Sequence, residues 1–409
     1  MLIQFSVQNF KSIRNKITLD MRATDIKENK EEIIKANNGK KYLPLAALYG
    51  PNGGGKSNVI EALFVLISRI VAPIMVTKGG VNFNRLNEMP SVVPFAFSQQ
   101  TQNEPTVFTI YFRTELAEYR YELHFNKDKI SYEKLDYVLH NSDKIVELFR
   151  RIDGKIQLKN KLSNLNVSAN LSVSMPLLAY LGFSYDKNDI VNDVVTWFVN
   201  KIDIINYGNP RQEMQMAIAS TEKEKTTILN MMRKLHLDIE DYRTEEDANG
   251  QVKFVYTTHV VSGYKAELEL HEESRGTRKI FGMLPFIVRS LSEGRVLVID
   301  ELDAKLHPLL LKYIIKLFSN MNINTHNAQL VFTSHDLSTM NSSVFRRDEI
   351  WFVAKGNCQD SSLYSLVEFK EFEDKRKKKN GTYDVQYLQG KYGADPYLQK
   401  ILKWSDIDG

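Results

Sequence analysis

The sequence predicts an α/β protein whose parallel sheet is interrupted by a long insertion. Three short apolar runs, at residues 45–49, 296–299 and 329–332, show no alternation, as expected of strands buried on both faces of a parallel sheet. Apolar residues at helical spacing follow the first run, and others lie between the second and third runs. The order strand, helix, insertion, helix, strand, helix, strand is typical of an α/β domain.

The first 150 residues combine this core with strands of another kind. Residues 2–8 and 16–21 alternate as strands, and residues 57–70 place apolar side chains on one side of a helix. Residues 107–112, 119–125 and 130–138 alternate again and are separated by polar turns. We expect these three strands to form antiparallel hairpins added to the core.

The middle of the chain predicts an insertion that is mainly helical. Residues 160–185 have no clear period, and helices are expected near 189–202 and 221–237. The elements expected after it are strands at 253–259 and 264–270, a helix at 277–291 that Pro285 should kink, and a helix at 308–319.

The composition is that of a globular protein, with 43% hydrophobic and 25% charged residues. Cys358 is the only cysteine, so no internal disulfide can form. The longest apolar stretch, residues 63–76, contains Ser68, Arg69 and Pro73 and is shorter than a membrane span. The chain starts directly in strand-like alternation without a signal-peptide pattern. We therefore expect a cytoplasmic protein without a membrane partner.

The net charge of +4 permits nucleic-acid contact without arguing for it. Much of the excess lies in the basic run at residues 375–379. Such a run is either a solvated loop or a phosphate-binding patch, and the sequence leaves both open.

The strongest motif is a complete G-x-x-x-x-G-K-S phosphate-binding loop, placed between a buried strand and a helix. Backbone N–H groups of such a loop surround the β-phosphate, and the helix N-terminus adds its positive dipole end. Lys56 is expected to reach the β- and γ-phosphates of ATP, and Ser57 to ligate Mg²⁺. The loop consists of Gly50, Pro51, Asn52, Gly53, Gly54, Gly55, Lys56 and Ser57.

Two carboxylates follow the apolar strand at 296–299, which is the Walker B arrangement. Asp300 is expected to hold Mg²⁺ through water. Glu301 is expected to polarise the attacking water as general base.

Two weaker signals accompany these motifs. His335 follows the apolar strand at 329–332 and can form a hydrogen bond with the γ-phosphate. Ser274 and Gly276 open the helix before Walker B and offer a hydroxyl, free N–H groups and a dipole end. Taken alone, Ser274 would be a helix N-cap.

Together, in this order, the four motifs resemble the ATPase heads of the SMC, RecF and OLD-like families. The resemblance rests on GPNGGGKSN at 50–58, SRGT at 274–277, DELDAKLHP at 300–308 and TSHD at 333–336. The segment NFKS at 9–12 is similar to their N-terminal segment. The tail at 387–394 looks like the ending of stand-alone OLD-like AAA ATPases from bacterial abortive-infection and anti-phage operons, such as the AbiL/RloA and PARIS types.

The resemblance implies an ABC/SMC-type P-loop ATPase head that forms a homodimer or higher oligomer around two nucleotides. The P-loop of one subunit would face Ser274 and Gly276 of the other, and Lys11, Ser12 and Asn58 would also touch the nucleotide. His307 stands where SMC heads carry an aspartate. Gln99 and Gln100 match the Q-loop glutamine only weakly.

This resemblance also suggests a division of the chain into three parts. Residues 1–150 would form the N-terminal half of the head with the P-loop and the hairpins. Residues 151–250 would be the helical insertion, and residues 251–409 the C-terminal half with the signature, Walker B and the histidine.

We expect an ATP-hydrolysing dimeric switch that senses or restrains, regulating a separate effector protein from a neighbouring gene in anti-phage defence. One alternative is a RecF-like DNA-repair ATPase that binds DNA itself, and another is an ATP-gated scaffold with negligible turnover. An intrinsic nuclease is not expected, because the segment after His335 is too short for a Toprim domain. An ABC transporter subunit is disfavoured, because the signature is not LSGGQ.

Overall fold

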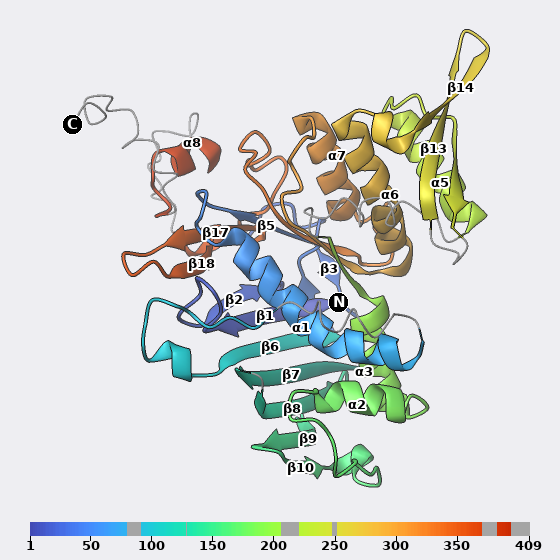
Figure 1. Ribbon diagram of the computed structural model, residues 1–409. Coiled ribbons are helices and arrows are strands. Elements are labelled where there is room, and N and C mark those ends of the chain that lie inside the picture. The colour runs from blue at the N-terminus through green and yellow to red at the C-terminus, as the bar shows by residue number, and fades with distance from the viewer. Residues whose placement is uncertain (80–90, 128, 206–220, 248–251, 370–382, 394–409) are drawn as a thin grey trace.

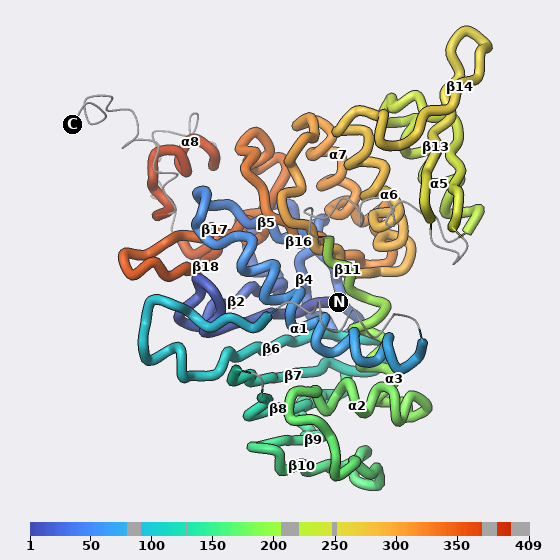
Figure 2. The backbone as a smooth tube through the Cα atoms, viewed as in Figure 1, coloured from blue at the N-terminus to red at the C-terminus, as the bar shows by residue number. Residues whose placement is uncertain are grey.

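The computed structural model describes residues 1–409 except 80–90, 128, 206–220, 248–251, 370–382 and 394–409. The basic run at 375–379 and the last residue of the predicted tail motif lie outside the described residues. Figures 1 and 2 show a central sheet with an antiparallel sheet on one side and the helices α6 and α7 on the other.

The central sheet has six strands in the order β11-β15-β16-β5-β17-β18. The first five are parallel, and β18 pairs antiparallel with β17. The α/β P-loop fold class predicted from the sequence is thus confirmed. The strands are β5 (Leu45–Tyr49), β11 (Ile202–Ile205), β15 (Val296–Ile299), β16 (Gln329–Thr333), β17 (Ile350–Lys355) and β18 (Ser361–Ser365).

Each of the three predicted core strands is buried on both faces. In β5, Ala46 and Leu48 pack into the core shared with α1 (Lys56–Thr77), whereas Leu45, Ala47 and Tyr49 pack into the core on the opposite face. The sequence shows no alternation here because both faces of the sheet are covered by apolar side chains.

Helix α1 lies between the two sheets. Its buried residues share one core with Val298 and Val331 of the central sheet and with Phe5 and Phe108 of the antiparallel sheet. By length and apolar composition α1 could cross a membrane, but it is a largely buried helix that directly follows the P-loop. Its apolar character is explained by contact with both sheets.

The antiparallel sheet has the strand order β10-β9-β8-β7-β6-β1-β2, which confirms the predicted hairpins. Helices α2 (Leu177–Ser184) and α3 (Asp189–Asn200) pack into the same core as α1. The strands are β1 (Leu2–Gln8), β2 (Ile17–Asp20), β6 (Thr106–Arg113), β7 (Ala117–Asn126), β8 (Lys129–Leu139), β9 (Val146–Ile152) and β10 (Lys155–Leu158).

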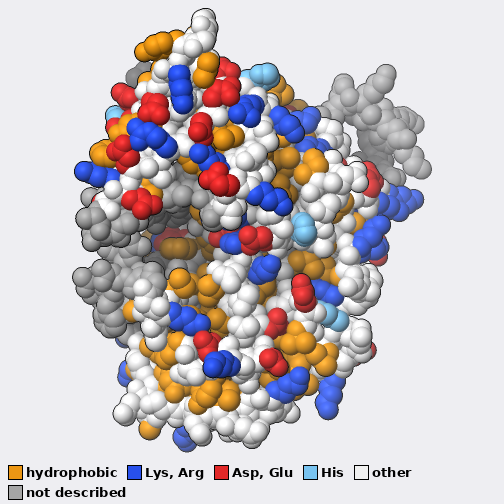
Figure 3. All heavy atoms as spheres, turned by 90° about the vertical axis from the view of Figure 1, so that its right-hand side faces the viewer, with side chains coloured by type: hydrophobic (Ala, Val, Ile, Leu, Met, Phe, Trp, Pro, Cys, Tyr) orange, Lys and Arg blue, Asp and Glu red, His pale blue; other side chains and the backbone are white. Residues whose placement is uncertain are grey.

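The opposite face of the central sheet carries α6 (Arg275–Glu293) and α7 (Pro308–Ser319). Beside α6 lies a three-stranded sheet of β12 (Asp241–Glu246), β13 (Val252–Val261) and β14 (Tyr264–Glu269), with α5 (Glu222–Lys234) packed on it. The β13–β14 hairpin projects from the body of the molecule, and hydrophobic side chains are visible near its end (Figures 1 and 3). Shorter elements are β3 (Ile34–Lys35), β4 (Lys41–Tyr42) and α8 (Tyr383–Leu388).

Residues 151–250 contain more strand than the sequence suggests. Helices α3 and α5 lie where helices are predicted, and α2 adds a third. However, β10 joins the antiparallel sheet, β11 extends the parallel sheet and β12 pairs with β13. The division of the chain at residues 150 and 250 stays a prediction.

The helix predicted at 277–291 is α6, which continues through Pro285 to Glu293.

Candidate functional site

The candidate site lies where three parallel strands end. Strands β15, β16 and β5 are neighbours in that order, so their C-terminal ends meet at one edge of the sheet. The P-loop follows β5, Asp300 and Glu301 follow β15, and His335 follows β16 by two residues. Ligand sites of open α/β sheets lie at this edge.

The P-loop backbone takes a shape that requires glycine at two positions. Gly55 has φ 106° directly before α1 begins at Lys56, which is a left-handed conformation that side chains disfavour. A Cβ atom on Gly50 would lie 2.2 Å from the carbonyl oxygen of Val353 in β17. The loop therefore fits tightly against the strand beside it, with the N-terminus of α1 at its end.

Lys56 is buried within its own loop. Its Nζ donates hydrogen bonds to the carbonyl oxygens of Gly50 (2.8 Å) and Pro51 (3.1 Å), and only 6% of the residue is exposed. Burial lowers the pKa of Lys56, while the nearby Asp300, Asp303 and Glu301 carboxylates oppose this shift. An ammonium group held this way fits phosphate oxygens as further acceptors.

A threonine of the neighbouring strand holds the Asp300 carboxylate and the backbone of Glu301. Thr333 donates its hydroxyl hydrogen to Asp300 Oδ1 (2.5 Å) and accepts a hydrogen bond from the backbone N–H of Glu301 (2.7 Å). Asp300 is buried, whereas Glu301 is exposed and has φ 50°. Thr333 was not predicted as a site residue, although it stands in the TSHD motif.

His335 and Asp303 complete the edge. The backbone N–H of His335 donates to Asp303 Oδ2 (3.1 Å). Burial and the positive charge of Lys56 lower the pKa of His335, against the opposing effect of the carboxylates of Asp303, Glu301 and Asp300. The imidazole is therefore neutral at neutral pH and can donate one hydrogen bond.

These residues fit a magnesium-bound nucleotide. Asp303 Oδ1 is buried and has no hydrogen-bond partner among the described residues, and Asp300 Oδ1 accepts the hydroxyl hydrogen of Thr333. Mg²⁺ prefers oxygen ligands, and it is commonly bound by one or two carboxylates together with water and phosphate. The exposed hydroxyl of Ser57, at the start of α1, is the remaining predicted ligand.

The N-terminal segment borders the P-loop through Ser12. Asn58 Nδ2 donates to Ser12 Oγ (2.6 Å), and Lys11 forms an ion pair with Glu61 of α1. Ser361 Oγ, at the start of β18, lies 2.7 Å from both Ser12 Oγ and the Gly54 carbonyl oxygen. Sequence reasoning missed Ser361, because no motif surrounds it.

The predicted signature residues stand apart from the P-loop contacts of their own chain. Ser274 is exposed and caps α6, accepting a hydrogen bond from the Thr277 N–H (3.1 Å). A Cβ atom on Gly276 would lie 3.2 Å from the Lys305 carbonyl oxygen, in the turn after Walker B. The hydrogen bonds of Ser274 in the described chain all stay within its own helix.

The weaker candidates lie at the periphery. Gln99 and Gln100 are exposed, and Gln100 donates to Glu104 (2.7 Å). Their segment is tied to the N-terminal segment by buried Asn9, which donates to the Thr101 carbonyl (2.7 Å). His307 caps α7 by accepting the Leu309 N–H (3.2 Å).

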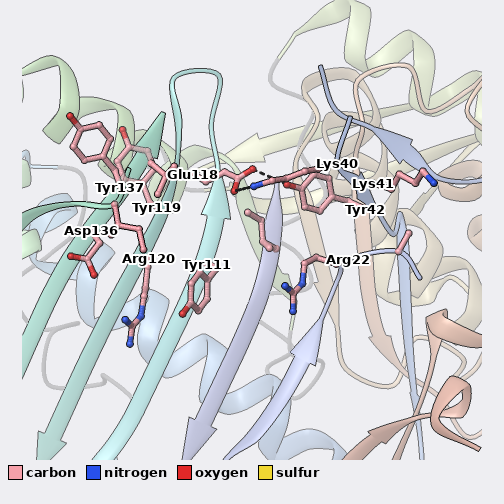
Figure 4. Close-up of a pocket in the computed structure, with 14 residues that line it drawn as sticks. Arg22, Lys40, Lys41, Tyr42, Tyr111, Glu118, Tyr119, Arg120, Asp136 and Tyr137 are labelled. Carbon is pink, nitrogen blue, oxygen red and sulfur yellow. Dashed lines mark hydrogen bonds and ion pairs between the residues drawn. The ribbon is translucent and has the colours of Figure 1, made fainter. Parts of the chain in front are cut away.

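A separate cavity of about 510 Å³ lies between the antiparallel sheet and the β3–β4 hairpin (Figure 4). Its charged groups already have partners: Glu118 accepts hydrogen bonds from Lys40 (2.6 Å), Tyr42 (2.9 Å) and Arg113 (2.7 Å). None of the predicted site residues lines this cavity.

A protein-family model matches residues 45–165 and 201–341, which is well over half of the chain. The family is described as "AAA domain, putative AbiEii toxin, Type IV TA system". No curated protein matches the chain.

Several solved structures resemble the chain at low sequence identity. An SMC head bound to the C-winged helix domain of ScpA has 13% identity and a TM-score of 0.47, covering 89% of this chain and 97% of its own. The SMC head domain from Thermotoga maritima has 13% identity and a TM-score of 0.42, covering 89% and 98%. An Smc head bound to the C-terminal domain of ScpA, derived from Pyrococcus furiosus, has 12% identity and a TM-score of 0.42, covering 90% and 96%.

Proposed function

The chain belongs to this AAA-domain family, and on that premise we propose that it binds and hydrolyses ATP with Mg²⁺ as a dimeric switch. The observation that carries the proposal is the convergence of Lys56, Asp300 and Glu301 at one edge of the sheet. Lys56 and the two adjacent carboxylates come from distant parts of the sequence, and the pKa of Lys56 is influenced by both carboxylates.

Some residues of the site bind the phosphates and the metal ion, and others act on the attacking water and the γ-phosphate. Lys56 and the start of α1 bind the phosphates. Ser57 and Asp300 would hold Mg²⁺, which would neutralise charge on the transferred phosphoryl group. Glu301 accepts a proton from the attacking water, and neutral His335 donates a hydrogen bond to the γ-phosphate. Thr333 keeps Asp300 and the Glu301 backbone in place.

The site requires a second chain to be complete. Ser274 is exposed, and its hydrogen bonds in the described part of the chain stay within the helix that it caps, which supports a role opposite the P-loop of another subunit. In this arrangement Ser274 and Gly276 contact the nucleotide held by the partner, and hydrolysis depends on dimer formation.

Replacing Lys56 with Ala tests the catalytic proposal. We expect loss of Mg²⁺-dependent ATPase activity and at least a tenfold weaker affinity for ATP, measured with a fluorescent ATP analogue. Exposed Lys312 of α7, replaced by Ala, is the matched control. Parental turnover in Lys56→Ala would falsify the P-loop assignment.

We further propose that the switch is cytoplasmic and regulates a separate effector in anti-phage defence. The family description refers to a toxin–antitoxin system, in which two proteins act as a pair, and this supports a role beside a separate effector. Expressed with its genomic neighbour, the parental gene should reduce phage growth, and Lys56→Ala should remove this protection. Full protection by this gene without a partner would contradict the proposal, and salt-dependent DNA binding by the isolated chain would favour a repair ATPase instead.

A further inference from the structure

Lys279 in the second turn of α6 is a buried lysine with an unusual set of acceptors. Its Nζ donates hydrogen bonds to the backbone carbonyl oxygens of Glu301 (2.6 Å) and Ala304 (2.8 Å), and only 7% of the residue is exposed. Burying an ammonium group is costly unless it is well hydrogen-bonded. The contact thus joins the helix that begins with Ser274 to the turn that carries Glu301.

This turn has a backbone that needs support. Glu301 (φ 50°) and Lys305 (φ 64°) both adopt the left-handed conformation, which is unfavourable for a non-glycine residue. On one side Thr333 accepts the Glu301 N–H, and on the other Lys279 binds the Glu301 carbonyl oxygen. Both ends of the Glu301 residue are therefore fixed by side chains from other elements.

The first turn of α6 touches the same turn at a second point. Gly276 lies so close to the Lys305 carbonyl oxygen that a Cβ atom would approach it to 3.2 Å. Two contacts, one from Gly276 and one from Lys279, thus join the start of α6 to residues 301–305.

We infer that Lys279 is a positioning residue that holds the general base Glu301 of its own chain from the helix that begins with Ser274. The inference rests on the proposed role of Glu301 in ATP hydrolysis. Lys279 holds the Glu301 carbonyl oxygen and with it the orientation of the carboxylate toward the attacking water. Binding of ATP to the chain's own P-loop does not involve Lys279.

The test compares Lys279→Met with the exposed control Lys312→Met. For Lys279→Met we expect kcat, per bound nucleotide, to fall at least tenfold while the affinity for a fluorescent ATP analogue stays within twofold. The control should keep both values. Parental kcat overturns the inference, and so does a parallel loss of affinity and turnover, which a merely structural role would produce. If the methionine variant does not fold, Lys279→Gln is used, which keeps a donor but is too short to bridge both carbonyls; the same split is expected.

Mixing experiments separate this inference from the shared site itself. Ser274→Arg mixed with Lys56→Ala should recover ATPase activity, because one P-loop then faces an intact signature. Lys279→Met mixed with Lys56→Ala should not recover, because the only intact P-loop shares its chain with the altered Lys279. Recovery in both mixtures overturns the inference, since Lys279 would then serve the partner. Failure of the Ser274→Arg mixture, with subunit exchange demonstrated, refutes the shared site and leaves the kcat measurement to judge Lys279.

Discussion

At the scale of single residues, Glu301 combines an exposed carboxylate with a left-handed backbone. Such conformations persist only where the surroundings hold them, and they cluster at functional sites. Thr333 stabilises this conformation by accepting the Glu301 N–H, and Lys279 does so by donating to the Glu301 carbonyl oxygen. The carboxylate itself stays available for a proton.

Replacing Glu301 with Gln should separate binding from hydrolysis. The amide keeps the shape of the side chain and cannot accept the proton of the attacking water, so ATP should bind with parental affinity while kcat falls by about 100-fold or more. Rapid-quench measurement of phosphate release and titration with a fluorescent ATP analogue report the two quantities. If turnover stays at the parental rate, Glu301 is not the base, and the role passes to Asp300 or to Asp303, whose Oδ1 has no hydrogen-bond partner among the described residues.

The residues predicted from sequence are those whose neighbours in the chain identify them. Lys56, Asp300 and Glu301 stand in contiguous motifs that follow a buried strand, so their type and position suffice. The supporting residues were not predictable, because Thr333 acts on a residue 33 positions away and Ser361 on one 349 positions away. Only the folded chain brings these pairs together.

At the scale of elements, the hairpin of β17 and β18 forms a wall of the P-loop. Val353 in β17 approaches Gly50, and Ser361 in β18 lies against Gly54 and Ser12. A Cβ atom on Gly55 would lie 2.2 Å from Ser361 Oγ. The hairpin thus borders the loop at Gly50, Gly54 and Gly55.

Replacing Ser361 with Ala should weaken nucleotide binding through the loop. Loss of one hydrogen bond of about 1 kcal/mol corresponds to roughly fivefold in Kd. We expect that change for ATP by isothermal titration, with kcat at saturation within twofold of the parental value. The adjacent, exposed Ser362→Ala is the control. An unchanged Kd in Ser361→Ala would show that the hairpin does not shape the loop.

The elements missed from sequence are short or depend on distant pairing. Strand β11 has four residues and is a strand because it pairs with β15, which lies far along the chain. Strand β17 was missed although Ile350–Val353 is an apolar run like those of the other core strands. By contrast, β7 alternates between buried and partly buried residues along its whole length, and its buried apolar side chains share a core with α1, α2 and α3.

At the scale of the whole molecule, the two predicted halves of the ATP site lie on different parts of the surface. The P-loop stands at the edge of the central sheet where the parallel strands end. Exposed Ser274 begins α6, which packs on the face of that sheet opposite α1. The three-stranded sheet that precedes Ser274 ends in a projecting hairpin with exposed Val261 and Tyr264 (Figure 1). This side of the molecule is therefore open to a second protein.

ATP should drive two chains together if Ser274 meets the partner's nucleotide. Glu301→Gln cannot hydrolyse ATP, so it should accumulate with ATP and Mg²⁺ at twice or a higher multiple of the chain mass in size-exclusion chromatography with light scattering. The added change Ser274→Arg places a long cationic side chain where the phosphates would approach and should restore the mass found without nucleotide.

Replacing Tyr264 with Ser on the hairpin tests whether the hairpin holds the assembly instead. An assembly that survives Tyr264→Ser but not Ser274→Arg is held by nucleotide. An assembly that is lost in Tyr264→Ser and forms equally with and without ATP is held by the hairpin. That result would contradict the shared site.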